Sequence, residues 1–213
     1  MDTEVNTESE LPTLDFLFIG GNLAINLVNT WRNRPIPGSR QNVHRLDLLW
    51  DISRAELWWR KACVQHGLIR YEEFGWSEES FEILLALRAE LRSLFEGIIA
   101  KHTELPQTPC LNRVLARGSF FVGTEGTHVS REYVSRNGRP DALLAIGLAA
   151  AELLAEGDLS RLHDCQSDRC LALFYDSTKS GTRHWCRPEC MNRARARENY
   201  WRSKEREQTP PSE

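Results

Sequence analysis

Two close pairs of cysteines near the C-terminal end constrain this chain more than any other feature. Cys165 and Cys170 form the first pair, and Cys186 and Cys190 form the second after a spacer of fifteen residues. Each pair can supply two thiolate ligands from one tight loop, and the spacer lets the two loops face each other. The spacing therefore predicts one structural zinc ion, held tetrahedrally by all four thiols.

The residues around the pairs predict a small finger fold. An apolar run and a turn-rich segment between the pairs indicate a knuckle followed by a hairpin. Pro188 suits the first turn of a helix, where its missing N–H is no loss, and Glu189 suits the positive end of that helix. We expect Cys186 and Cys190 to flank the start of a helix that runs to about Glu207, an arrangement like a treble clef.

Two disulfides or four unrelated thiols are the alternatives to a zinc site. Disulfides need an oxidising compartment. The first 30 residues show no basic segment followed by an apolar one, so we expect a cytoplasmic protein with reduced thiols. His163 and His184 lie beside the cysteines in the sequence and each could replace one as a ligand, but four thiolates complete the site without them.

The same residues resemble a known family. The segment from Cys165 to Arg193 ends in Cys-Met-Asn-Arg and resembles the CGNR zinc finger, which is named for a Cys-Gly-Asn-Arg signature. Met191 stands where that signature has Gly, and a Gly there could serve a positive φ or a close backbone approach. Near the other end, the apolar stretch that ends in Asn29 and Thr30 resembles the start of the ABATE domain.

The resemblance covers nearly the whole chain and implies a function. In this family the finger closes the chain behind an ABATE domain, and the proteins are described as stress-induced bacterial transcription regulators. It therefore implies a DNA-binding protein in which the finger meets the nucleic acid. The first domain would then sense a small-molecule effector or pair two subunits as a homodimer.

We expect an α+β fold in two parts. Residues 14–158 should form a mainly α-helical N-terminal domain with a small β-hairpin, and residues 162–207 a treble-clef-like zinc finger with four cysteine ligands. Residues 158–164 contain no Pro- or Ser-rich linker, so the finger should dock on the first domain. The tails at 1–13 and 208–213 are expected to be disordered, the first because it is acidic and poor in apolar residues.

Three elements of the first domain have clear sequence signals. Ser77 should cap a long helix in which leucines recur at three- and four-residue steps up to Ile98. Asp141 should cap a helix over 142–156 that is apolar almost all round, which makes it the expected central helix and too short to cross a membrane. Segments 119–122 and 127–134 are rich in β-formers and predict a hairpin.

The other elements have weaker signals. They are a strand at 14–19, a helix at 23–30 capped by Asn22, a loop at 31–41, a helix at 46–67 that could break near Asp51, with a Ser53–Glu56 capping box and a stop at Gly67, and a short helix at 111–116. The loop carries Arg32, Arg34 and Arg40, which could hold an anion, although a solvated loop explains them as well. Gly20 and Gly21 belong to no phosphate-loop pattern.

Charge is distributed unevenly along the chain. Eight basic and three acidic residues between Arg183 and Arg206 give this segment +5, whereas the whole chain carries −3. An acidic body with a basic C-terminal helix would present one end to a polyanion. The residues expected to contact DNA are Arg193, Arg195, Arg197, Tyr200, Arg202 and Lys204.

We expect no catalysis from this chain. A four-thiolate zinc has no open coordination position with which to activate water. The six histidines fall in no metalloprotease or nucleophile pattern, and Cys63 lies on an expected helix as a packed thiol. The alternative to DNA binding is a zinc-stapled protein-interaction module, whose basic helix docks an acidic partner or the chain's own acidic body. We expect no membrane partner.

Overall fold

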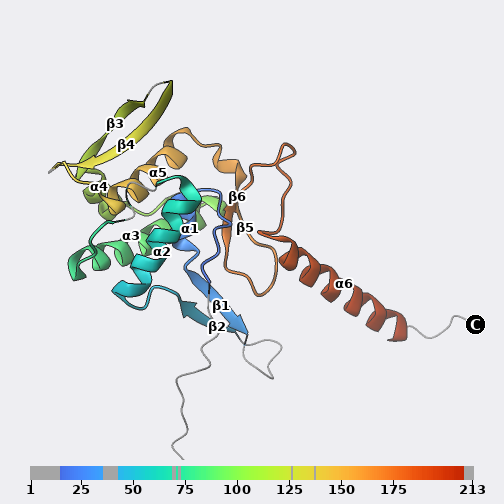
Figure 1. Cartoon of the computed structure of the whole chain (residues 1–213). Helices are drawn as coiled ribbons and strands as arrows, with labels where there is room; N and C mark the ends of the chain where they lie inside the picture. The colour runs from blue at the N-terminus through green and yellow to red at the C-terminus, as the bar shows by residue number, and fades with distance from the viewer. Residues whose placement is uncertain are drawn as a thin grey trace, which may run out of the picture.

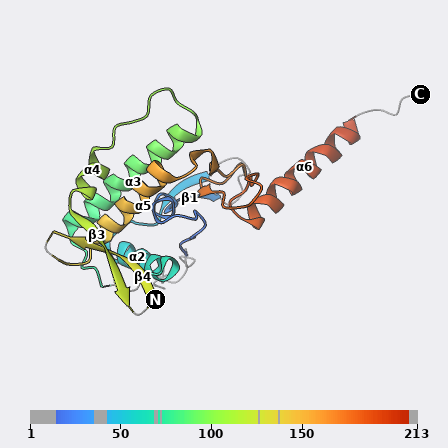
Figure 2. The ribbon, with the colours of Figure 1, turned by 90° about the horizontal axis from the view of Figure 1, so that it is seen from above.

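A helical body carries the finger on one side, and the last helix projects from the finger away from that body (Figures 1 and 2). The computed structural model describes residues 15–35, 43–68, 71, 73–125, 127–136 and 138–208. The expected tail at 1–13 lies outside the described residues, and of 208–213 only Gln208 is described, as the last residue of the final helix. No helix in this described part is both long and apolar enough to span a membrane.

The central helix of the body is α5 (Ala142–Glu156), as its sequence predicts. Asp141 caps it by accepting a hydrogen bond from the Leu144 N–H at 3.1 Å. The helix packs against α1 (Leu23–Val28), α3 (Glu78–Ile99) and α4 (Pro109–Leu115). Gly147 lets α4 approach closely, because a Cβ at this position would lie 2.7 Å from a methyl group of Val114.

The ends of two further helices follow from capping chemistry. Ser77 caps α3 and exchanges hydrogen bonds with Ser80, which confirms the expected start. Gly67 ends α2 (Ile52–His66) in the left-handed conformation, also as expected. The helix begins at Ile52, next to the break considered near Asp51, so the expected helix over 46–51 was wrong. The Asp51 carboxylate accepts from the Arg54 N–H and replaces the proposed Ser53 cap.

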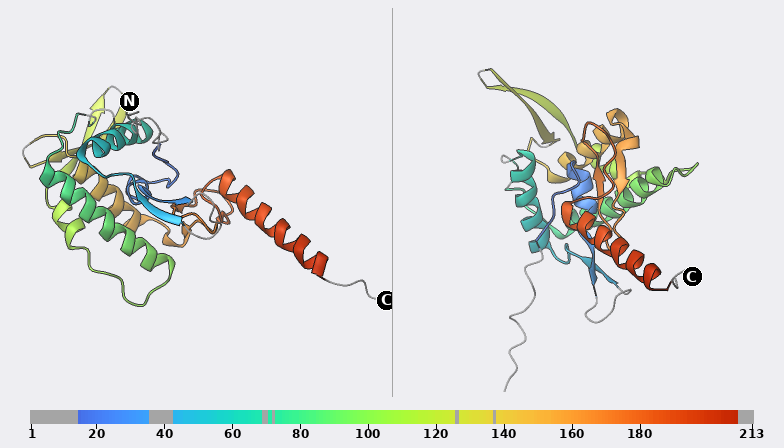
Figure 3. Two further views of the ribbon diagram at one scale, coloured as in Figure 1. Left: turned by 90° about the horizontal axis from the view of Figure 1, so that it is seen from below. Right: turned by 90° about the vertical axis from the view of Figure 1, so that its right-hand side faces the viewer.

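Three two-stranded antiparallel sheets lie around the helices in the described part of the chain. Strands β3 (Gly118–Glu125) and β4 (His128–Ser135) form the expected hairpin, in which Gly118 pairs with Ser135. It projects from the body in Figure 3. The finger contributes β5 (Leu162–Asp164) and β6 (Leu173–Tyr175), preceded by a 3₁₀ turn at Leu159–Arg161.

The third sheet corrects two expectations. Residues 31–35 form strand β1 (Trp31–Pro35) instead of a loop. Residues 43–47 form strand β2 (Val43–Asp47), whose last two residues were expected to begin a helix. Backbone pairing from Trp31↔Asp47 to Pro35↔Val43 overrides the local Arg- and Pro-rich composition. Residues 15–19 form no strand, although the carbonyl of Gly20 accepts a hydrogen bond from the Tyr175 N–H. Residues 36–42, including Arg40, lie outside the described residues.

An ion pair between the buried Arg88 and the half-buried Asp47 fixes this sheet to α3. The side chain of Arg88 is 2% exposed and donates to both carboxylate oxygens of Asp47 at 2.6 Å and to Thr30 Oγ1 at 2.9 Å. The indole of Trp31 donates to the same carboxylate at 3.1 Å. Burial is the largest single influence and acts to raise the pKa of Asp47. The hydrogen bonds from Arg88, the Leu49 N–H and Trp31, together with the charge of Arg88, outweigh it, so the pKa lies below its usual range. Asp47 therefore stays ionised and holds α3 against the sheet.

The finger hairpin is part of the body's core. Leu162 and Leu173 are buried in the same apolar cluster as α1, α3 and α5. Asn29, at the end of α1, is buried and behaves like a neighbouring strand: its Nδ2 donates to the Leu173 carbonyl at 2.8 Å, and its Oδ1 accepts from the Leu173 N–H at 2.9 Å. Arg92 of α3 donates to the Leu171 carbonyl at 2.7 Å. The finger therefore docks on the body as expected. The two parts share one apolar core, and side chains of the body form hydrogen bonds with the backbone of the finger hairpin.

Asn29→Ala should destabilise the whole chain by about 2–4 kcal/mol, because it leaves the buried N–H and C=O of Leu173 without partners. The measurement is the free energy of unfolding from denaturant titration of zinc-loaded protein. Asn112→Ala, on the exposed face of α4, is the matched control and should change stability by less than about 0.5 kcal/mol. Equal effects of the two substitutions would contradict the role assigned to Asn29.

Candidate functional site

The four cysteine sulfurs converge in the finger as the sequence predicts. The Sγ atoms of Cys165, Cys170, Cys186 and Cys190 all lie within 4.8 Å of one another. Cys186 Sγ lies 3.7 Å from Cys170 Sγ and 3.6 Å from Cys190 Sγ. A tetrahedron with zinc–sulfur bonds of about 2.3 Å has edges of about 3.8 Å, so these separations fit a zinc ion. The finger therefore holds one structural zinc.

Backbone hydrogen bonds shape the loops that present the sulfurs. The Cys170 N–H donates to the Ser167 carbonyl at 2.9 Å and closes the first knuckle. The Cys186 N–H donates to Cys165 Sγ at 3.4 Å and ties the second loop to the first. Such donors stabilise thiolate charge and orient the ligands toward the metal. These hydrogen bonds hold the two loops so that the four sulfurs converge.

Four sulfurs at this spacing cannot all be ionised at neutral pH without a cation. Hydrogen bonds to the sulfurs of Cys165 and Cys170, together with burial, raise the pKa of Cys186. Hydrogen bonding to Cys165, with burial and the charge of that sulfur, raises the pKa of Cys170 to about 12. Zinc binding must therefore displace protons from these thiols.

The loop between the pairs is held by Asp176, which sequence analysis did not single out. Its buried carboxylate accepts from Thr178 N–H and Oγ1 at 2.9 and 2.6 Å and from the Arg183 N–H at 2.8 Å. These hydrogen bonds, that of the Thr178 hydroxyl first, lower the pKa of Asp176 to about 2. The Asp-Ser-Thr order is typical of an Asx turn and could have indicated this role.

The other candidate ligands lie outside the sulfur cluster. The ring of His163 packs on Phe174 with a centroid distance of 5.8 Å, and the ring of His184 lies against Trp185 at 5.7 Å. Among the described residues, the cluster of side chains that could bind a metal ion consists of the four cysteines and includes neither histidine. Cys63 is fully buried in the body's core, as expected for a packed thiol.

The final helix, α6 (Pro188–Gln208), begins at the metal site. Pro188 occupies its first position, and the N–H groups of Cys190 and Met191 donate to the Arg187 carbonyl at 3.1 and 3.3 Å. Met191 is an ordinary helical residue and is not among the described residues with positive φ. Methionine is therefore accommodated at the signature glycine position without backbone strain.

The basic residues of α6 divide into two groups. Arg193 and Arg197 lie about one turn apart on the helix and face the first knuckle. Arg193 donates to Ser167 Oγ at 3.4 Å, and Arg197 pairs with Asp168 at 3.0 Å. Arg195 lies on the opposite side of the helix and is exposed, with no ion pair to any residue that the structure describes. The first group thus also serves to position the helix on the finger.

The distal half of α6 is exposed. Arg202 forms an exposed pair with Glu198 on the same helix. Tyr200 is 46% and Trp201 55% exposed, whereas Ala194, nearer the finger, is half-buried. Lys204 is half-buried. The described residues of the body leave this end uncovered, because α6 leaves the finger in a direction away from the body (Figure 3).

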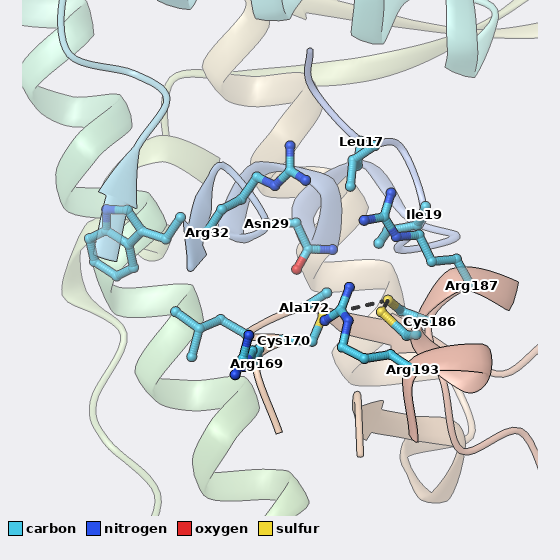
Figure 4. Close-up of a pocket in the computed structure, with 13 residues that line it drawn as sticks. Leu17, Ile19, Asn29, Arg32, Arg169, Cys170, Ala172, Cys186, Arg187 and Arg193 are labelled. Carbon is cyan, nitrogen blue, oxygen red and sulfur yellow. Dashed lines mark hydrogen bonds between the residues drawn. The ribbon is translucent and has the colours of Figure 1, made fainter. Parts of the chain in front are cut away.

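Beside the metal site lies a cavity of about 170 Å³ between body and finger. Figure 4 shows Arg32, from β1 of the body, and Arg169, Arg187 and Arg193, from the finger, around it. The sequence places Arg32 beside Arg34 and Arg40 as a candidate anion ligand, but it gives no sign that Arg32 meets the finger arginines. No local pattern could have done so, because the two segments meet only in the folded chain.

Comparison with known proteins gives two matches to family models. The model described as "CGNR zinc finger" matches residues 161–203, and the ABATE model, described as "Putative stress-induced transcription regulator", matches residues 21–157. A search of curated proteins found no match.

Serine at any one of the four zinc-binding cysteines should release the ion, because a structural zinc site needs all its ligands. Elemental analysis should give one zinc per chain for the wild type. Cys63→Ser, which removes a thiol from the core and not from the finger, should leave the zinc content unchanged. Stoichiometric zinc in two of the four single variants would overturn the assignment.

The affinity for zinc should fall as the pH is lowered, because thiols with raised pKa hold the protons that zinc must displace. We expect a loss of about tenfold or more per pH unit between about pH 8 and pH 6. Competition with a chelator of known proton affinity measures this dependence. A pH-independent zinc affinity in that range would show that the sulfurs bind the metal without releasing protons.

Proposed function

The chain belongs to the ABATE family and ends in a CGNR zinc finger, and we propose that it is a transcription regulator that binds duplex DNA through α6. The observation that carries this proposal is the position of that helix. The metal site anchors its first turn through Cys190, while the rest projects away from the body (Figures 1 and 2). A basic helix held at one end and exposed along its length can enter a groove of DNA.

The charges on α6 suit phosphate contacts. Arg195 is exposed, and the pairs that Arg197 and Arg202 form with Asp168 and Glu198 are more than half exposed on the arginine side. Such surface pairs contribute about 0–1 kcal/mol each, so phosphate oxygens can replace the carboxylates at little cost. The acidic remainder of the chain is repelled by DNA, which favours an approach with α6 foremost.

We propose no catalytic role and a cytoplasmic location. Four thiolates complete the coordination of zinc and leave no position for a reacting water. The zinc in this proposal is structural: it fixes the direction in which α6 leaves the finger.

One observation favours the alternative, a protein-interaction module. Tyr200 and Trp201 are both exposed on α6, with their rings 5.4 Å apart at the centroids. Exposed aromatic residues commonly anchor protein interfaces. On this alternative, α6 would dock a partner protein through these rings, and its arginines would add charge complementarity without binding DNA.

Binding to random-sequence duplex DNA, measured as a function of salt, separates the two functions. With three or four phosphates contacted, log affinity should fall against log salt with a slope of roughly −3 to −4. Arg195→Gln should weaken binding and make the slope shallower by about one, because one phosphate contact is lost.

Arg60→Gln, an exposed position on α2 of the body, is the matched control and should bind DNA like the wild type. Each variant is compared at full zinc occupancy. Absence of duplex binding at about 50 mM salt, or equal binding by wild type and a double Arg195→Gln, Arg202→Gln variant, would leave the protein-interaction module as the function.

A further inference from the structure

The cavity beside the metal site joins the two parts of the chain. One wall comes from residues 17–32 of the body and the other from residues 169–193 of the finger. Apolar side chains, among them Leu17, Ile19 and Trp31, line part of it, and the rest is strongly basic. Neither Asp nor Glu occurs among the described residues that line it.

Three of the arginines in this cavity have few acidic partners. Arg32 donates to the neutral carbonyl of Asp15 at 3.1 Å, and Arg193 reaches the Ser167 hydroxyl at 3.4 Å. The Nε of Arg187 is buried, and the exposed carboxylate of Glu189 lies 3.7 Å from it. This separation is too long for a hydrogen bond, so Nε lacks a hydrogen-bond partner among the described residues. A buried donor without a partner is costly, so a ligand that accepts from it is favoured.

The zinc cluster carries less charge than the arginines around it. A zinc ion with four thiolates has a formal charge of −2. The four arginines that line the cavity, Arg32, Arg169, Arg187 and Arg193, carry one positive charge each. The arginines therefore exceed the charge of the cluster by two in a partly enclosed space. Burial, and after it the nearby charge of Arg187, lowers the pKa of Arg32, while the cysteine sulfurs oppose this shift.

We propose that this cavity binds a small dianion, inorganic phosphate or a phosphate monoester, between Arg32 of the body and the arginines of the finger. Planar guanidinium groups match the oxygens of phosphate and can bind them in pairs. The volume of about 170 Å³ is below the range of about 300–1,000 Å³ typical of drug-sized ligands. It suits a phosphate with a few waters, and the apolar wall suits a small ester group.

The excess of two charges distinguishes this ligand from the backbone of DNA. Each phosphodiester carries a single negative charge, whereas phosphate and its monoesters carry close to two above their second pKa of about 6. The cavity also lies where body and finger meet, at the base of α6 and away from its exposed length (Figure 4). A bound dianion would connect Arg32 to the finger and so strengthen the contact between the two parts.

Calorimetric titration of the zinc-loaded full chain with inorganic phosphate tests this inference without DNA, so its result does not depend on the DNA-binding function. The titration is run at about pH 8, where phosphate is dianionic, with ionic strength held constant by chloride. We expect one phosphate to bind per chain. The Arg32→Gln variant should bind phosphate at least about tenfold more weakly, because one charged partner is lost. The control Arg60→Gln should bind phosphate with wild-type affinity.

Two further arms make the result decisive. Dimethyl phosphate, a diester with one charge, should not bind measurably under the same conditions. Arg187→Gln should also weaken phosphate binding. Because residue 187 adjoins the zinc ligand Cys186, the zinc content of this variant is measured as well. Arg32→Gln lies in the body and tests the cavity without altering the finger. The proposal is overturned if the wild type fails to bind phosphate at millimolar concentration, if Arg32→Gln binds it as tightly, or if the diester binds equally well.

Discussion

The structure depends on a hairpin of the zinc finger that completes the core of the helical body. Leu162 and Leu173 are buried among the apolar residues of α1, α3 and α5, so removing the finger would expose that core. The backbone polar groups of β6 have hydrogen-bond partners in the body. The Asn29 side chain bonds both the N–H and the C=O of Leu173, and the Gly20 carbonyl accepts from the Tyr175 N–H. Buried backbone groups must find such partners, and here the body supplies them. Finger and body therefore fold as one unit.

Zinc and the hairpin have separate tasks within that unit. The hairpin sets where the finger lies, and the zinc sets the direction of α6, because Cys190 in its first turn is a ligand and Arg193 and Arg197 contact the knuckle at 167–168. Beyond this anchored turn the helix is exposed. The direction of α6 relative to the body is thus fixed by covalent and metal geometry, and the arginine-lined cavity lies at the junction where a ligand could act on it.

What could be predicted from the sequence was local chemistry. The cysteine spacing predicted the metal site, and the positions of Ser77, Asp141 and Gly67 predicted helix ends. These signals are readable because a helix cap or a ligand pair involves residues only a few positions apart in the sequence. Contacts between distant segments left no such signal. Asn29 meets Leu173 across 144 residues, and Arg32 meets the finger arginines only in the folded chain. Strand β1 was missed for the same reason: its pairing with β2 overrides a composition typical of a loop.

The central claim, that finger and body form one cooperative unit, is tested most directly by native-state hydrogen exchange of the zinc-loaded chain. The amide of Leu173, bonded to Asn29, and that of Tyr175, bonded to Gly20, report on the junction, while Ile146 in α5 reports on the body's core. We expect all three amides to open with the same free energy, that of global unfolding. If Leu173 and Tyr175 exchange as fast as the exposed end of α6 while Ile146 stays protected, the finger is merely tethered to the body and the claim of one cooperative unit is wrong.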